Sequence, residues 1–305
     1  MKRKLLIFLL VFACAVSAAG CSAGGKAPDQ EEPDSEILKE MGTVNQLDNL
    51  LKNHERVALE HSFYFKDGAV ETWYIYKDEE LFVSDLNGDL AICSNDLLYG
   101  FDPSLGYPYA FLTMDTTPQE IVSELETGVV FQYNEIETIV SSSEKDGVLY
   151  LETTADIGEA EQEAFDYYGY DIQDGDSTIY RYEMDSATKE IQSMTVTIRP
   201  KNGEDYVVHK MERVKDPEKY QPDEQLVSQI FNEDSRTVTV IADPGTENET
   251  SYSCTVGKGC MVSIYVSGPQ RAFYDDEACT KQVTEDRIED LNADATLYTK
   301  TIAAE

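Results

Sequence analysis

The sequence predicts an α+β fold with a curved antiparallel sheet and a few covering helices. Apolar and polar residues alternate with a period of two over many short runs, of which residues 70–76 and 191–199 are the clearest. Turn sequences rich in Asp-Gly and Asn-Gly join successive runs, as in antiparallel meanders. Short amphipathic stretches between the runs are typical of helices that cover one sheet face.

The first half of the chain is predicted to contain a leading helix, a meander and a second helix. Thr43 and Gln46 fit a capping box, so a helix is expected over residues 43–53. Strands are expected at residues 57–65, 70–76, 81–84 and 90–93. Residues 100–109 are rich in Gly, Pro and Tyr and are predicted to form a loop. Thr117 and Glu120 cap a further helix, expected over residues 117–126.

The second half continues the strand pattern and ends in a smaller block. Strands are expected at residues 129–133, 135–141, 148–154, 177–184, 191–199 and 206–214. The acidic, Tyr-rich residues 157–175 are predicted to form a helical or irregular excursion over the sheet. A closing helix at residues 222–231 precedes a polar hinge at residues 232–235. Residues 237–302 then form a separate block of short strands, which we expect to fold independently.

The N-terminus has the order of a bacterial lipoprotein export signal. Basic residues occupy positions 2–4, and an apolar run follows at residues 5–16. Residues 18–21 resemble a lipobox, in which Cys21 is lipidated and becomes the new N-terminus. An uncleaved membrane helix is disfavoured because about 20 apolar residues are needed to span a bilayer. A cleaved secretory signal followed by a chance cysteine is the other alternative.

These signals predict four parts of the chain and an extracytoplasmic location. Residues 1–20 are the signal peptide, and residues 21–35 are a flexible tether with few apolar residues. Residues 36–231 form the sheet domain, and residues 236–303 form a small β-rich module. The mature protein is expected to be held at the bacterial cell membrane by the lipid on Cys21, since two acyl chains suffice for durable anchoring.

The charge balance restricts the partners. The chain has 59 acidic and 24 basic residues, a formal net charge of −35. Such a surface repels nucleic acid and anionic lipid head groups, so no nucleic-acid partner is expected. A solubilising extracellular surface explains the charge, and binding of cations or of a basic partner is the alternative.

Cysteine and histidine spacing predicts neither zinc nor a cofactor. The cysteines after the signal are Cys93, Cys254, Cys260 and Cys279, and their spacing fits no zinc motif. A symmetric hairpin around residues 257–259 would place Cys254 opposite Val262 or Met261. An extracytoplasmic location permits disulfides. A Cys254–Cys260 disulfide is nevertheless less favoured than a role for both residues as small apolar side chains that pack in the core.

The candidate site residues are an acidic turn and a set of tyrosines. Asp171, Asp174 and Asp176 lie close in sequence, either as a cation site or as a solvated turn. The tyrosines that could form the floor of a lipid or glycan site are Tyr74, Tyr76, Tyr107, Tyr109, Tyr167, Tyr168 and Tyr170. Core packing explains these side chains equally well. No catalytic motif is present in the sequence, and we expect no catalytic residues.

The element order of residues 35–231 resembles the LolA-like half-barrel of bacterial lipoprotein carriers and mycobacterial lipid-binding lipoproteins. That resemblance implies a curved sheet with an apolar concave face under a helical lid. The resemblance concerns only the order of helices and strands, so no ligand-binding residues can be assigned from that family. A plain antiparallel α+β domain without a cavity is the alternative.

The C-terminal block resembles one unit of the internalin B-repeat, also called the Listeria–Bacteroides repeat. The resemblance is carried by residues 254–264, by residues 272–281 with the sequence AFYDDEACTK, and by residues 294–300 with the sequence DATLYTK. It implies a small β-grasp-like module of a surface protein. The Gly-Tyr pair before the first aromatic residue and the flanking Trp residues of that family are missing here.

Together these observations predict a membrane-anchored binding or interaction protein without catalytic activity. Its partner would be an amphiphile or a surface protein. A carboxylate-based extracytoplasmic hydrolase is one alternative, since two positioned carboxylates suffice for that chemistry. A structural envelope protein without a ligand is the other.

Overall fold

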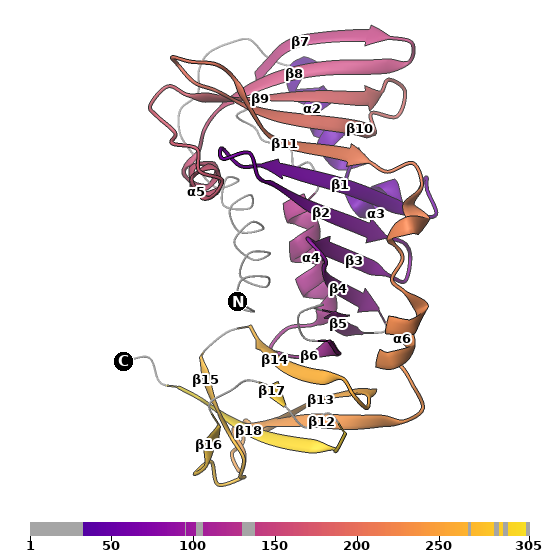
Figure 1. The fold of residues 1–305 in the computed structure, drawn as a ribbon, viewed down its shortest axis with the longest axis vertical. Coiled ribbons are helices and arrows are strands. Elements are labelled where there is room, and N and C mark those ends of the chain that lie inside the picture. The colour runs from indigo at the N-terminus through magenta and orange to yellow at the C-terminus, as the bar shows by residue number, and fades with distance from the viewer. Residues whose placement is uncertain are drawn as a thin grey trace. The chain divides into compact units, whose positions relative to one another are not determined.

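The computed structural model describes residues 33–94, 96–101, 106–129, 138–267, 270–283, 287–288 and 292–302. The fold is α+β with antiparallel sheet as its main component, as predicted (Figure 1). The chain divides into two compact units. Unit 1 comprises Met1–Glu79 and Ser123–Tyr220, and unit 2 comprises Glu80–Val122 and Gln221–Glu305. Cys21 and nearly all of the predicted signal and tether lie outside the described residues.

Unit 1 contains seven strands in the order β2-β1-β11-β10-β9-β8-β7, and each neighbouring pair is antiparallel. They are β1 (Val57–Tyr64), β2 (Val70–Lys77), β7 (Thr138–Lys145), β8 (Val148–Asp156), β9 (Ser177–Asp185), β10 (Ile191–Arg199) and β11 (Tyr206–Arg213). The tight turn between β7 and β8 places Asp146 and Gly147 at φ 54° and 80°, the conformation that Asp-Gly hairpins favour. The predicted strand at residues 129–133 falls on residues that the structure does not describe, apart from Val129, which is helical.

The helices of unit 1 are α2 (Pro33–Val44), α3 (Leu47–Leu50), α5 (Glu159–Tyr167) and the 3-10 helix η2 (Pro217–Tyr220). The prediction that Thr43 caps a helix is wrong. Thr43 lies in the last turn of α2, where its Oγ1 donates to the Lys39 carbonyl at 2.9 Å. Helix α2 already begins at Pro33, within the predicted tether, because a proline is well tolerated in the first helical turn.

Asn45 fixes the junction of α2 and α3 against the sheet. Its Nδ2 donates to the carbonyls of Met41 and Lys189 at 2.8 and 2.9 Å, and its Oδ1 accepts from the Ile191 N–H at 2.7 Å. Asn45 is 4% exposed, so these bonds satisfy polar groups that would otherwise be buried without partners. The helix pair is thereby held at the end of the sheet where β9 turns into β10.

Helix α4 (Pro118–Val129) starts as the sequence predicts. The Thr117 N–H donates to Glu120 Oε2 at 2.8 Å, and the Glu120 N–H donates to Thr117 Oγ1 at 3.2 Å. This reciprocal pair is a capping box. The hydrogen bonds from Thr117 and Thr116 lower the pKa of the Glu120 carboxyl.

Unit 2 contains strands of two sheets and helix α6 (Glu224–Ile230). Six strands of unit 2 are neighbours in one sheet in the order β17-β14-β6-β5-β4-β3, and a separate five-stranded sheet has the order β13-β12-β18-β15-β16. The six strands are β3 (Phe82–Leu86), β4 (Asp89–Ser94), β5 (Leu97–Phe101), β6 (Pro108–Met114), β14 (Met261–Val266) and β17 (Arg287–Ile288). The separate sheet is formed by β12 (Ser235–Ala242), β13 (Thr250–Gly257), β15 (Arg271–Tyr274), β16 (Gln282–Val283) and β18 (Ala295–Thr301).

The predicted loop at residues 100–109 is wrong, because its ends belong to β5 and β6. Gly100 pairs with both Ala91 and Tyr109, and a Cβ on it would approach the Leu90 carbonyl oxygen to 1.9 Å. The Tyr109 hydroxyl donates to that same carbonyl at 3.2 Å. Gly100 and Tyr109 therefore allow β4 and β5 to pack closely, although glycine and tyrosine together are typical of loops.

Strand β14 does not form the expected hairpin with β13. It pairs in parallel with β6, from Met261 opposite Tyr109 to Val266 opposite Met114. Strand β13 pairs instead with β12, so Cys254 lies opposite Val238. Residues 80–122 therefore group with the C-terminal block, a different division from the predicted boundary between residues 231 and 236. Independent folding of residues 237–302 stays a prediction.

The four described cysteines, Cys93, Cys254, Cys260 and Cys279, are free thiols. Burial raises the pKa of Cys254 and of Cys260 to about 11, and the nearby Arg236 guanidinium only partly offsets it. The two thiols are therefore protonated at neutral pH and chemically quiet.

Gly100→Ala should lower the free energy of unfolding of unit 2 by about 2 to 3 kcal/mol, because β4 and β5 must move apart to admit the methyl group. Differential scanning calorimetry on the full chain measures the change. Gly158→Ala is the matched control, since the nearest atom to its added Cβ is the Glu161 carboxylate at 4.0 Å. Equal melting temperatures for the two variants would contradict the close approach at Gly100.

Candidate binding site

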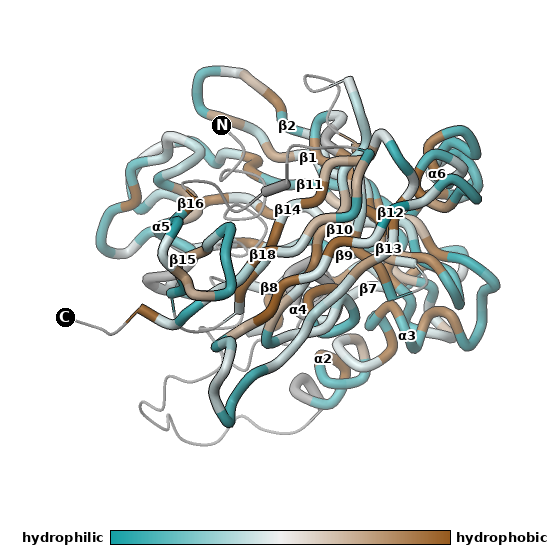
Figure 2. The backbone as a smooth tube through the Cα atoms, turned by 90° about the horizontal axis from the view of Figure 1, so that it is seen from below, coloured by the Kyte–Doolittle hydropathy of each residue, from teal (hydrophilic) through white to brown (hydrophobic). Residues whose placement is uncertain are grey.

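The sheet of unit 1 has one apolar face and one polar face, as strand alternation requires. We call the first the apolar face. Its side chains on five neighbouring strands include Leu59, His61, Phe63, Trp73, Ile75, Met194, Val196, Ile198, Tyr182 and Met211. The opposite face carries side chains such as Glu60, Tyr74, Thr195, Arg181 and Glu183, which are half-buried or exposed. Figure 2 shows the alternation of hydrophobic and hydrophilic residues along the strands.

Helices attach to the apolar face at its two ends. At one end, Lys77 Nζ of β2 donates to Asp48 of α3 at 2.6 Å. At the other end, the Tyr180 hydroxyl donates to Glu161 of α5 at 2.6 Å. The aromatic and histidine side chains lie between these two attachments.

Three rings of the apolar face and the ring of Tyr168, which directly follows α5, form a nearly parallel stack. His61 lies 5.3 Å from His209, His209 lies 4.5 Å from Phe63, and Phe63 lies 5.5 Å from Tyr168, with interplanar angles of 9°, 8° and 2°. These are offset-stacking distances between ring centroids. Trp73 tilts against His61 at 5.6 Å. We call these five residues the ring stack.

The ring stack contains two buried polar atoms that have no hydrogen-bond partner among the described residues. They are Nε2 of His61 and the hydroxyl of Tyr168. His61 is 2% exposed and Tyr168 is 3% exposed. The other ring nitrogen of His61, Nδ1, is bonded to His209 Nε2 at 3.0 Å. Unsatisfied buried polar atoms are uncommon and require an explanation.

Both histidines are uncharged at neutral pH. Burial, and after it the neighbouring His209, lowers the pKa of His61 well below its ordinary value of 6.5. Burial lowers the pKa of His209 to about 3. Burial also raises the pKa of the Tyr168 hydroxyl, and the Glu71 carboxylate adds to this effect. The ring stack is therefore an apolar surface with neutral polar groups.

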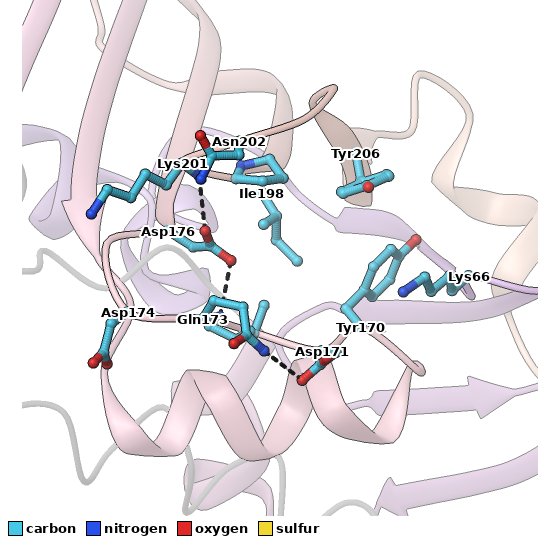
Figure 3. A pocket seen from close by; sticks show the side chains of 12 residues that line it. Lys66, Tyr170, Asp171, Gln173, Asp174, Asp176, Ile198, Lys201, Asn202 and Tyr206 are labelled. Carbon is cyan, nitrogen blue, oxygen red and sulfur yellow. Dashed lines mark hydrogen bonds between the residues drawn. The ribbon is translucent and has the colours of Figure 1, made fainter.

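A pocket of about 220 Å³ opens where β10 leads into β11 (Figure 3). Ile198 of β10 and its register partner Tyr206 of β11 line it, together with Tyr170 and Lys66. Ile198 is 1% exposed and continues the row of Val196 and Met194 along β10. The backbone N–H of Lys66 donates to the Tyr168 carbonyl at 3.1 Å, so a residue that lines the pocket is bonded to a residue of the ring stack. The apolar face thus begins at the pocket.

The seven predicted tyrosines do not form one site. Tyr168 belongs to the ring stack, and Tyr167 packs against it at 5.2 Å between ring centroids. The hydroxyl of Tyr170, two residues further on, donates to the Tyr64 carbonyl at 3.0 Å. Tyr74 stacks at 4.7 Å on Tyr220 on the polar face. Tyr76 is fully buried, and its hydroxyl donates to Asp78 at 2.7 Å. Tyr107 and Tyr109 belong to unit 2.

The three predicted aspartates line the pocket but do not converge on a cation. Asp176 accepts backbone N–H groups of Lys201 and Gln173 at 2.8 and 3.0 Å, and Asp171 accepts from Gln173 Nε2 at 2.8 Å. Figure 3 shows Asp174 apart from both. Within the described ranges, no three acidic, histidine or cysteine side chains come together as metal ligands. The hydrogen bonds of Asp176 are those of a turn.

The histidine pair was not singled out from the sequence. His61 is in phase with Leu59 and Phe63 along β1, which places it on the buried side of that strand. His209 lies 148 residues later, on the strand beside β1. The alternation of residues along β1 predicts that the His61 side chain faces the core. Only the pairing of β1 with β11 shows that the two histidine rings are in contact.

The helices of the described ranges include none long and apolar enough to span a membrane. No family model matches the chain, and no curated protein matches it.

Solved structures that are similar to part of this chain include the following three. LolA superfamily protein NE2245 from Nitrosomonas europaea is 10% identical with a TM-score of 0.22, and the match covers 64% of this chain and 100% of that one. Lipoprotein LppX from Mycobacterium tuberculosis is 13% identical with a TM-score of 0.32, covering 62% and 100%. LprF from Mycobacterium bovis is 10% identical with a TM-score of 0.27, covering 61% and 94%. Scores this low carry no argument about function, so both sequence resemblances stay predictions.

Proposed function

We propose that this chain is a membrane-anchored, extracytoplasmic binding protein that takes up an amphiphile on the apolar face of unit 1, without catalysis. The observation that carries the proposal is the ring stack, in which neutral polar atoms without partners lie within a continuous apolar sheet face. Ligand sites are mostly apolar with a few oriented polar groups. The LolA-like layout predicted for residues 35–231 agrees with this role.

The geometry supports entry from the pocket. Ile198 forms part of the pocket and begins the apolar row on β10, so a chain entering there meets Val196 and Met194 next. These side chains are buried. Binding of an acyl chain against them therefore requires that the segments covering them move aside. The apolar surface that an acyl chain buries is worth about 0.8 kcal/mol per methylene, which favours such uptake.

Trp73 provides a direct test because it is the only tryptophan of the chain and contacts His61 in the ring stack. The uncharged probe N-phenyl-1-naphthylamine should bind the full mature chain saturably, and energy transfer from Trp73 should increase with binding. Val196→Phe should reduce probe binding by about tenfold by overfilling the face. Thr195→Phe, on the opposite face, is the control. If no probe binds and no lipid is extracted from the purified protein, a scaffold role replaces the binding role.

The membrane anchor is tested at Cys21. Cys21→Ser should abolish incorporation of fatty acid and change the size of the protein, because the lipid is attached at Cys21 and the signal peptide is then uncleaved or cleaved elsewhere. Fractionation and labelling with radioactive fatty acid measure the change. A Cys21→Ser variant that stays cell-associated at normal size, and still incorporates label, would refute the anchor.

A further inference from the structure

Resting on the proposed function, we propose that the ring stack selects amphiphiles with an uncharged head group that bears hydroxyls, and that these hydroxyls bond to His61 Nε2 and the Tyr168 hydroxyl. The ring centroids of His61 and Tyr168 lie 6.2 and 5.5 Å from that of Phe63, so both rings pack around the same phenylalanine. A ligand that lacked polar atoms would leave both unsatisfied.

Two unsatisfied polar atoms in one buried ring stack indicate a missing partner. A buried donor or acceptor that loses its hydrogen bond costs more than the bond would contribute. Both side chains are almost fully buried, so bulk solvent does not supply the missing bonds. A ligand hydroxyl that supplies them regains this free energy.

The protonation of the histidine pair favours a hydroxyl over a group that only donates or only accepts. One proton lies between His61 Nδ1 and His209 Nε2, which are 3.0 Å apart. If His61 carries it, His61 Nε2 is an acceptor, and if His209 carries it, His61 Nε2 is a donor. The Tyr168 hydroxyl can also play both roles. A hydroxyl satisfies either arrangement.

The charges around the ring stack disfavour an anionic head group. Glu71 pairs in register with Phe63 and lies close enough to Tyr168 to raise the pKa of its hydroxyl, after the larger effect of burial. The two cations at the far end of the face are already bound to carboxylates, Arg213 to Glu190 and Lys77 to Asp48. At the pocket, Lys66 and Lys201 are matched by three aspartates. A carboxylate or phosphate would lose its hydration without gaining a cation.

The test compares two ligands with the same acyl chain on the full mature protein at pH 7.5. One is 1-decanoylglycerol, which is uncharged and has two hydroxyls, and the other is decanoate. Each displaces N-phenyl-1-naphthylamine, and Trp73 reports the displacement. We expect 1-decanoylglycerol to bind about tenfold more tightly than decanoate. Tyr168→Phe and His61→Asn should each weaken it about fivefold relative to decanoate, so that the affinity ratio of the two ligands falls to about two.

His61→Asn retains an amide at the position of Nδ1, so the contact with His209 survives while Nε2 is removed. Tyr150→Phe, an exposed tyrosine of β8, is the matched control and should change neither affinity. If the probe binds but the two ligands bind equally, or if neither variant alters their ratio, the selectivity is overturned and the proposed function stands. If the probe itself fails to bind, the proposed function and the selectivity both fail.

Discussion

Glu190→Ala should lower the free energy of unfolding of unit 1 by about 3 to 5 kcal/mol, because it removes the shared acceptor of a buried cluster. Glu190 is 6% exposed. Its carboxylate accepts from Arg213 at 2.7 Å, His54 at 2.9 Å and Asn53 at 3.1 Å. Burial acts to raise the pKa of Glu190, but these hydrogen bonds outweigh it and hold the pKa below the ordinary value. The alanine variant would leave the Arg213 guanidinium without a counterion.

Urea denaturation followed by Trp73 fluorescence measures this change, since Trp73 belongs to unit 1. Glu190→Gln should lose less stability than Glu190→Ala, because an amide oxygen still accepts one hydrogen bond. Glu183→Ala, on the exposed polar face, should change the stability by less than about 0.5 kcal/mol. A Glu190→Ala variant as stable as Glu183→Ala would show that the cluster does not stabilise the sheet.

Most of the strands of unit 1 follow from residue alternation alone. In β1, β2 and β10 one side of each strand is apolar and the other polar, and this pattern sets both the element type and the buried face. The helix start at Thr117 was equally readable, because the capping box uses only local contacts. Such features depend on residues within a few positions of one another.

Features that depend on distant partners could not be read in this way. Strands β5 and β6 contain Gly100, Pro108 and Tyr109, whose local preferences favour a loop, and only the partner strands make an extended conformation favourable. Strand β14 was expected beside β13 because a short turn separates them, yet its apolar side chains are buried in a parallel pair with β6. Tertiary packing overrides local turn chemistry at both places.

The candidate site also depends on contacts between residues that are distant in the sequence. The tyrosines that lie together come from one short segment, residues 167–170, and the sequence indicates them by composition. The histidine pair joins residues 148 positions apart. Neither histidine belongs to a motif, and the feature that distinguishes the site is a contact between strands that are neighbours in the sheet but not in the sequence.

The histidine pair should make the stability of unit 1 fall as the pH is lowered. Both pKa values lie below the ordinary 6.5 in the folded state, that of His209 at about 3. The unfolded chain therefore binds more protons than the folded chain below about pH 6.5, so acid favours unfolding. This destabilisation is absent above about pH 7.5, grows progressively below about pH 6.5, and levels off only below the folded-state pKa values. Between pH 7.5 and 5 the pair should cost about 2 to 4 kcal/mol.

Carboxylates also titrate in this chain, and with 59 acidic residues the relief of their repulsion acts in the opposite direction at low pH. The double variant His61→Asn with His209→Gln separates the two effects, because amide groups replace the two bonded ring nitrogens and neither side chain titrates. Urea denaturation of both proteins, monitored through Trp73 from pH 7.5 to 5, gives the difference. The wild-type stability should fall more steeply than that of the double variant by the stated 2 to 4 kcal/mol. Parallel profiles would mean that the histidines are as free to take up protons in the folded chain as in the unfolded one, and that the ring stack is open to water.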